Sequence, residues 1–185
     1  MADFSALAHL RQATKSWHQT IDHHPLLSPL VRPGLDLAGY GRALAALHGP
    51  ISALEQRCLL GLADLGADYS LTPRQGWLDA DLMDLGLVAP AVDRECPAVS
   101  DLPGLIGLLY VLEGSRLGGE VIARQLVQSL PVGAPLRFFR SSGAEAAWAN
   151  FSLFAARCPP EQIGLCCETA VAAFAFIRDH LDRLR

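Results

Sequence analysis

The chain has 185 residues, of which 51% are hydrophobic and 18% are charged, and its formal net charge is −4 at pH 7. This length and apolar content predict a single folded domain over residues 1–185 and exclude a disordered chain, which combines low hydrophobicity with high net charge. The small acidic excess argues against a dedicated nucleic-acid-binding protein, because such proteins normally carry a basic excess.

Hydrophobic residues recur every three or four positions along most of the chain, which is typical of amphipathic helices. In chain order, this spacing predicts helices over residues 5–22, 36–62, 73–86, 102–130, 145–157 and 161–184. Pro50 predicts a kink in the second helix, and the proline-rich residues 88–100 are expected to form a loop. No segment alternates between apolar and polar residues as a half-buried strand does. We therefore expect an all-α fold.

No segment is expected to cross a membrane. The longest apolar runs, residues 102–112 and 170–177, end at charged residues and fall short of the roughly 20 apolar residues that a spanning helix needs. The first residues carry no apolar signal-peptide segment. The five cysteines form no C-x-x-C pair, and the adjacent Cys166 and Cys167 are expected to be buried thiols rather than redox or metal groups. These features favour a reduced, cytoplasmic protein.

Three glycines lie close together in the middle of the predicted helix over residues 102–130. Gly114, Gly118 and Gly119 each cost about 1 kcal/mol relative to alanine in a helix interior. Gly114 and Gly118 are four residues apart and share one face of the helix, so something must approach the backbone closely there. Either another helix crosses at these small residues, or a flat ligand lies against them on a helix that bends at the glycines. The spacing alone leaves both alternatives open.

His18 lies at the edge of the apolar stripe of the first predicted helix, next to Trp17 and one turn before Ile21. A histidine in such a place is commonly a hydrogen-bonded core residue, but its imidazole also suits iron, and haem iron often takes one histidine ligand. Arg11 lies two turns earlier on the same edge, with Lys15 near it. These cations either pair with an anionic group of a ligand held by His18 or form an ordinary solvated face.

Two segments of the chain resemble the haem oxygenase family. Residues 10–18, LRQATKSWH, are similar to its proximal helix pattern L-[RK]-x-A-T-x-x-x-H. Residues 110–119, YVLEGSRLGG, are similar to its glycine-rich distal helix in the form of bacterial members, including those encoded with bacteriophytochromes. Between them, Arg74, Leu78, Asp81-Leu82 and Leu85-Gly86 match a family pattern R-x3-L-x2-D-L-x2-L-G. The resemblance covers roughly residues 7–180.

The resemblance implies a haem-oxygenase-like bundle that holds haem between the first helix and a kinked glycine-rich distal helix. It also implies oxidative cleavage of haem to biliverdin, with release of ferrous iron and carbon monoxide. Haem would be both substrate and cofactor, without a separate flavin or nicotinamide site. Dioxygen is the second substrate, and the electrons would come from an external ferredoxin or flavin reductase. A phytochrome that accepts biliverdin is a further implied partner.

The resemblance also assigns roles to residues. It implies that His18 is the proximal iron ligand and that Gly114, Ser115 and Gly118 form the catalytic distal face, where dioxygen is steered toward a meso carbon. No histidine occurs between His48 and His180, so the distal helix supplies none, as ring oxidation rather than peroxidase chemistry requires. The remaining residues implied in haem binding are Arg11, Thr14, Lys15, Tyr110, Gly119 and Phe174.

The chain departs from the family pattern at three positions. Ser115 stands where mammalian-type members carry an aspartate, and Ser142 and Ala149 stand where bacterial members carry a tyrosine and an arginine. Basic residues that clamp the haem propionates are also missing there, so propionate binding would depend on Arg11 and Lys15. These changes favour an alternative: a weakly active or inactive haem-oxygenase-like protein that binds haem, another tetrapyrrole or a partner in a regulatory role. A haem-free enzyme of the same fold, thiaminase-like or di-iron, lacks its residues here.

Overall fold

A computed structural model describes residues 5–140 and 143–185. In chain order, these residues form α1 (Ala6–Asp22), the 3-10 turn η1 (Ser28–Val31), α2 (Leu37–Asp64), α3 (Gln75–Asp84), α4 (Leu102–Ser129), α5 (Ala144–Ala155), the 3-10 turn η2 (Pro160–Gln162) and α6 (Ile163–Arg183). The described residues contain no strand, so the all-α expectation is confirmed. Every predicted helix is present, with each end within two residues of its predicted place. The two 3-10 turns were not predicted.

Local signals set the helix ends. The side chains of Ser5, Asp36 and Asp101 accept hydrogen bonds from backbone N–H groups at the starts of α1, α2 and α4, at 3.3, 2.7 and 2.8 Å. Gly66 and Gly86 follow the last turns of α2 and α3 at φ of 56° and 65°, which is the left-handed conformation that glycine adopts most easily. Both ends are therefore determined by the sequence itself.

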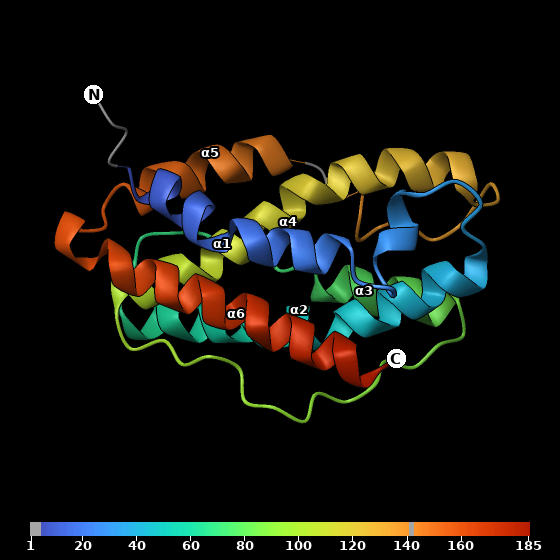
Figure 1. Cartoon of the computed structure of the whole chain (residues 1–185), viewed down its shortest axis with the longest axis horizontal. Coiled ribbons are helices and arrows are strands. Elements are labelled where there is room, and N and C mark those ends of the chain that lie inside the picture. Colours follow the sequence, from blue (N-terminus) through green and yellow to red (C-terminus); the bar gives the residue numbers. More distant parts are fainter. Residues whose placement is uncertain (1–4, 141–142) are drawn as a thin grey trace.

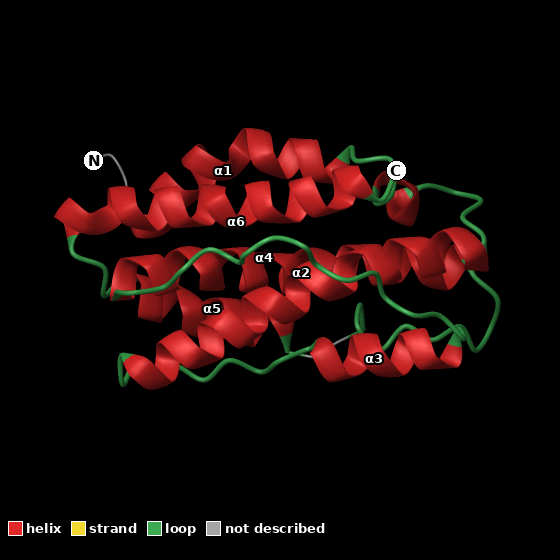
Figure 2. Ribbon diagram, turned by 90° about the horizontal axis from the view of Figure 1, so that it is seen from below, coloured by secondary structure: helices red, strands yellow, loops and turns green. Residues whose placement is uncertain are grey.

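The helices are arranged in three layers (Figure 2). Helices α1 and α6 lie side by side in one layer, α2 and α4 run through the middle, and α3 and α5 cover the opposite side. Helix α4 packs against α2, α5, α6 and η1, which makes it the central element. The expected loop over residues 88–100 is confirmed, and it crosses α2, where Gly49 and Gly61 leave room for Val92 and Val99.

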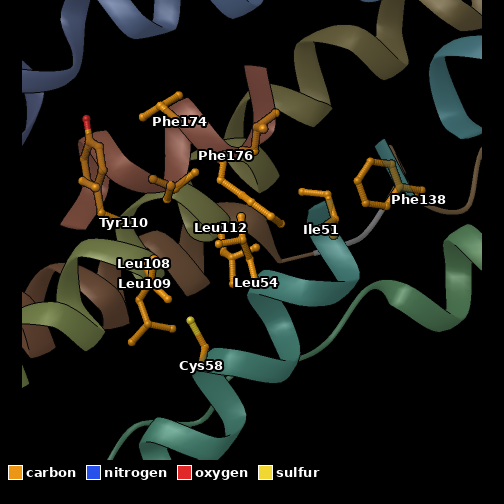
Figure 3. Close-up of a cluster of buried hydrophobic side chains, with 14 of the residues drawn as sticks. Ile51, Leu54, Cys58, Leu108, Leu109, Tyr110, Leu112, Phe138, Phe174 and Phe176 are labelled. Atoms are coloured by element: carbon orange, nitrogen blue, oxygen red, sulfur yellow. The ribbon is translucent and has the colours of Figure 1, made fainter. Parts of the chain in front are cut away.

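The hydrophobic core lies between α2, α4 and α6. Figure 3 shows Ile51 and Leu54 of α2 pointing toward Leu112 of α4, with Phe176 of α6 beside them. Helix α2 continues through the buried Pro50 without a break in helical structure. Helix α4 is also helical throughout. It changes direction along its length: in Figure 1 its first part crosses the middle of the molecule and its last turns run along the upper edge.

Helix α4 approaches α6 most closely at Gly107. A Cβ atom at this position would lie 2.5 Å from the carbonyl oxygen of Cys166 and 3.0 Å from the backbone nitrogen of Ala170. No real side chain tolerates such distances to backbone atoms, so only glycine allows this crossing. Helix α4 therefore does cross another helix at a glycine, but this crossing point lies two turns before Gly114.

One stretch of the described residues, Pro160–Arg183, is long and apolar enough by length and composition to span a membrane. It contains α6, whose apolar residues form part of the core between α1 and α4. Its hydrophobicity is thus used in helix packing, as in the core helix of a bundle. Cys166 in its first turn is fully buried and Cys167 is half-buried, and both are free thiols as expected.

Candidate functional site

An apolar cavity of about 430 Å³ lies between α1, η1, α2, α4 and α6. Its volume falls within the range of roughly 300–1,000 Å³ that is typical of small-molecule sites. His18 and Asp22 of α1 and Ser115 of α4 are its polar lining residues among those described, and the others are aliphatic, aromatic or glycine. No lysine or arginine is among the described lining residues. The cavity therefore suits a large, mostly hydrophobic ligand.

His18 projects from α1 into this cavity and is partly buried. Its ring contacts Phe174 of α6 edge to face, with 4.5 Å between the centroids, and the ring of Tyr110 lies 6.3 Å away. Burial lowers the pKa of the His18 imidazole, and the carboxylate of Asp22, one turn further along α1, opposes that shift without reversing it. The imidazole is therefore neutral at pH 7, which is the form that binds a metal ion.

Gly114 and Gly118 line the cavity from α4. A Cβ atom at Gly118 would meet no protein atom within 4 Å, and one at Gly114 would meet only the Trp148 ring, at 3.7 Å. No backbone atom of another element among the described residues would lie within 4 Å of a Cβ at either glycine, in contrast to Gly107. The close helix crossing and the cavity face are thus two separate glycine features of one helix, and Gly114 and Gly118 belong to the cavity.

Ser115 connects the cavity to a buried arginine. The Ser115 hydroxyl donates to the carbonyl oxygen of Leu112 at 2.7 Å and accepts a hydrogen bond from Nη2 of Arg74 at 2.6 Å. The Arg74 guanidinium is 2% exposed and stacks over the Phe138 ring at 4.8 Å, and Phe138 is itself a cavity wall. Burial lowers the pKa of Arg74 to about 10, so the group stays charged at neutral pH. A fixed positive charge therefore lies behind the glycine face.

Two buried carboxylates balance the charges of Arg74 and Arg116. Glu55 of α2 accepts hydrogen bonds from the backbone nitrogens of Arg74 and Gln75 at 2.9 and 3.0 Å, so it also caps the start of α3. Glu113 accepts from the Tyr69 hydroxyl at 2.8 Å and lies 3.3 Å from Nε of Arg116. Burial raises the pKa of Glu55, whereas the hydrogen bonds and charge of Arg74 act in the opposite direction. The network ties α2, α3 and α4 together behind the cavity.

The fold and the site can be compared with known proteins. No family model matches the chain. A curated protein from Xanthomonas campestris pv. campestris (strain 8004), named "Heme oxygenase", is 30% identical over 129 residues, which cover 68% of this chain and 77% of that protein. The chain belongs to the haem oxygenase family. A crystal structure of the NO- and CO-bound haem oxygenase from Neisseria meningitidis has the same fold, with a TM-score of 0.73 over 97% of this chain and 92% of that chain, at 22% identity.

Within this haem oxygenase fold, the ten residues predicted for the site divide into two equal groups. Those that line the cavity are His18, Gly114, Ser115, Gly118 and Phe174. Those that do not line it are Arg11, Thr14, Lys15, Tyr110 and Gly119. The first group comes from α1, α4 and α6, so the structure brings together the two segments that carry the family resemblance.

The second group is arranged around the cavity in different ways. The Tyr110 hydroxyl donates to Oγ1 of Thr14 at 3.2 Å, because the only proton of Thr14 is used on the carbonyl oxygen of Leu10 at 2.7 Å. Gly119 turns away from the cavity, and a Cβ there would contact the Phe139 ring at 3.7 Å. Tyr110, Thr14 and Gly119 thus hold the walls together rather than face a ligand.

The predicted basic residues are on the surface. Arg11 and Lys15 are both exposed on α1. Ala149 is exposed on α5, and Ser142 lies outside the described residues. Among the described residues of this haem oxygenase homologue, no lysine or arginine lines the cavity. An anionic group of a ligand can therefore meet a cation only where that group extends beyond the cavity lining.

Two features of the site were missed in the sequence. Asp22 was overlooked although its spacing of four residues from His18 places both on one helix face. Arg74 was noted only as part of a family pattern, and no role was assigned to it. Its contact with Ser115 spans 41 residues and depends on the packing of α3 against α2, for which the sequence offers no local signal.

Proposed function

We propose that this protein is a haem oxygenase that cleaves haem to biliverdin and releases ferrous iron and carbon monoxide. The observation that carries the proposal is one apolar cavity lined by a neutral imidazole on α1 and by two glycines of α4 beside which a Cβ atom would find space. A flat apolar macrocycle with one metal ion fits such a cavity, because His18 is the only imidazole among its described lining residues and Gly114 and Gly118 leave space beside the backbone. The residues therefore fit haem.

The roles of this chain's own residues follow from that fit. Bound haem supplies the iron that accepts electrons and the porphyrin ring that is oxidised. His18 would hold the iron, while Gly114 and Gly118 keep the α4 face of the cavity free of side chains. The carboxylate of Asp22, one turn away, raises the basicity of the imidazole, and the hydrocarbon walls exclude bulk water from the cavity.

Ser115 is the residue that we assign to holding water on the α4 side. Its proton is used on Leu112, and one lone pair accepts from Arg74, so a second lone pair remains to accept a hydrogen bond from water. The charge of Arg74 polarises this hydroxyl from behind. No described histidine, lysine, aspartate or glutamate of α4 lines the cavity, so ordered water rather than an acid–base side chain would direct proton supply to the α4 side.

The electrons would come from an external donor, either a ferredoxin or a flavin reductase, because the sequence contains no nucleotide-binding motif. The product biliverdin would be available to a phytochrome. Reduced cysteines and a core helix as the only candidate membrane span among the described residues support a cytoplasmic location.

One observation favours a second candidate function. The cavity lining holds no described cation, and both Arg11 and Lys15 are exposed. Weak fixation of the propionates would let haem or another tetrapyrrole bind without being positioned for ring cleavage. The second candidate is thus a haem-oxygenase-like protein with weak or no turnover that binds a tetrapyrrole in a regulatory role.

A titration with haemin tests both candidates. The wild-type protein should give a Soret band typical of histidine-ligated haem, which His18→Ala abolishes and His9→Ala, an exposed histidine on the same helix, leaves intact. Turnover with ascorbate, or with ferredoxin and its reductase, should then release biliverdin. Haem binding without biliverdin supports the second candidate, a wild-type protein that binds no haem overturns the first, and one that binds neither haem nor biliverdin overturns both.

A further inference from the structure

Two thiols outside the cavity lie unusually close together. The Sγ atoms of Cys158 and Cys166 are 3.1 Å apart, and both cysteines are buried and reduced. A disulfide has an S–S bond of about 2.05 Å, so the two sulfurs would have to move together by only about 1 Å. This proximity is found although the two residues belong to different parts of the fold, the turn after α5 and the first turn of α6.

The backbone between the two cysteines holds them in this arrangement. The nitrogen of Cys158 donates to the carbonyl oxygen of Ala155, which continues the end of α5 as a turn. Pro159 and Pro160 then restrict the chain, and the nitrogen of Gln162 donates to the carbonyl oxygen of Pro159 to close η2. The backbone of this turn therefore keeps the two thiols next to each other, without any movement of a flexible segment.

We infer that Cys158 and Cys166 form a reversible disulfide when the protein meets hydrogen peroxide. Cys158 retains 7% exposure and Cys166 none, so peroxide reaches Cys158 first. The Cys158 sulfur takes one oxygen from the peroxide, and a sulfenic acid and one water are formed. The Cys166 sulfur then attacks the oxidised sulfur, and the hydroxyl group leaves as a second water with the Cys166 proton. In total, two thiols and one peroxide give one disulfide and two waters.

Cys167, the residue next to Cys166, is the alternative partner for Cys158, so the proposed pairing can be tested against it. Burial raises the pKa of the Cys166 thiol, which disfavours its direct attack on peroxide, and its distance of 3.1 Å from the Cys158 sulfur makes it the resolving partner. Cys167 is half-buried, and its side chain leaves the helix at about 100° from that of Cys166. Cytoplasmic disulfides are usually transient and redox-sensing, which fits a pair that is reduced at rest. The pair does not line the cavity, so this inference is independent of the proposed function.

Peptide mapping of the full chain tests the pairing. Purified protein is treated with hydrogen peroxide, blocked with an alkylating agent and digested with trypsin and a glutamate-specific protease, which cuts between the cysteines at Glu161 and after Glu168. We expect a fragment containing Cys158 joined to one containing Cys166 and Cys167, with the loss of two hydrogen atoms. The free thiols should fall from five to three and return on reduction.

Three single variants identify the partner and control for folding. The linked fragment should be lost in Cys158→Ser and Cys166→Ser and retained in Cys167→Ser, with all three variants showing the helical circular dichroism of the wild type. A link that survives Cys166→Ser but not Cys167→Ser overturns the inference. So does conversion of Cys158 to sulfinic acid without any linked fragment.

Discussion

Replacing Gly118 with alanine should stabilise the ligand-free protein. Gly118 lies inside α4 without a positive φ, and a Cβ atom there would meet no atom within 4 Å. Glycine costs about 0.5–1 kcal/mol relative to alanine in a helix interior, and no steric cost offsets that gain. For a chain of this size, the thermal midpoint should therefore rise by about 1–4 °C.

The same methyl group should weaken haem binding. Gly118 lines the cavity, so the added atom takes up space beside the ligand. One extra methyl in a well-packed site typically costs about 1–3 kcal/mol, which corresponds to a rise in the haem Kd of about 5- to 150-fold. Gly76→Ala is the matched control, because a Cβ at Gly76 also meets no atom within 4 Å but Gly76 belongs to α3, none of whose residues line the cavity. It should leave haem affinity unchanged.

Two measurements decide this prediction. Thermal unfolding of the ligand-free protein, followed by circular dichroism, gives the stability of Gly118→Ala relative to the wild type. Titration with haemin at the Soret band gives the affinity. A variant that melts higher and binds haem as well as the wild type would refute the assignment of the α4 glycines to the ligand face. A variant that melts lower would refute the claim that the space next to Gly118 is empty.

Three further perturbations test the packing and charge arguments. Gly107→Ala should lower the free energy of unfolding by about 2–3 kcal/mol in urea titrations, since its Cβ would clash with backbone atoms of α6, and an unchanged midpoint would contradict the crossing. Ser115→Ala removes a hydrogen-bond partner of buried Arg74 and should cost about 1–2 kcal/mol in the same assay, whereas Ser115→Thr should retain most of it. Burial lowers the pKa values of His24 and His180, so their contribution to stability is complete above about pH 6.5 and is lost as the pH falls further. Thermal midpoints between pH 7 and 5 should show this loss, and His180→Phe should reduce it.

The helices could be predicted to within two residues because their signals are local. Hydrophobic spacing marks each helix, and the capping side chains of Ser5, Asp36 and Asp101 are adjacent to the helices that they begin. Local signals could not show which α4 glycines lie at a helix crossing and which line a cavity. Gly107 and Gly118 have the same chemistry and lie in the same helix, and they differ only in what lies opposite: the backbone of α6 for one and an open cavity for the other. That difference arises from tertiary packing alone.

The position of the cavity along α1 could not be predicted from the sequence either. Helical periodicity fixes the face on which a residue lies, and it placed Arg11 and Lys15 on the same edge as His18. It does not fix where along the helix a cavity begins and ends, because that depends on the elements packed against the helix. The cavity lies from His18 toward Asp22, while Arg11 and Lys15 are exposed on the turns of α1 that precede His18. These cations can therefore pair only with ligand groups that remain outside the apolar cavity, where carboxylates keep much of their hydration and an ion pair contributes little. Retention of haem by this chain should accordingly depend more on His18 and the apolar walls than on its charged residues.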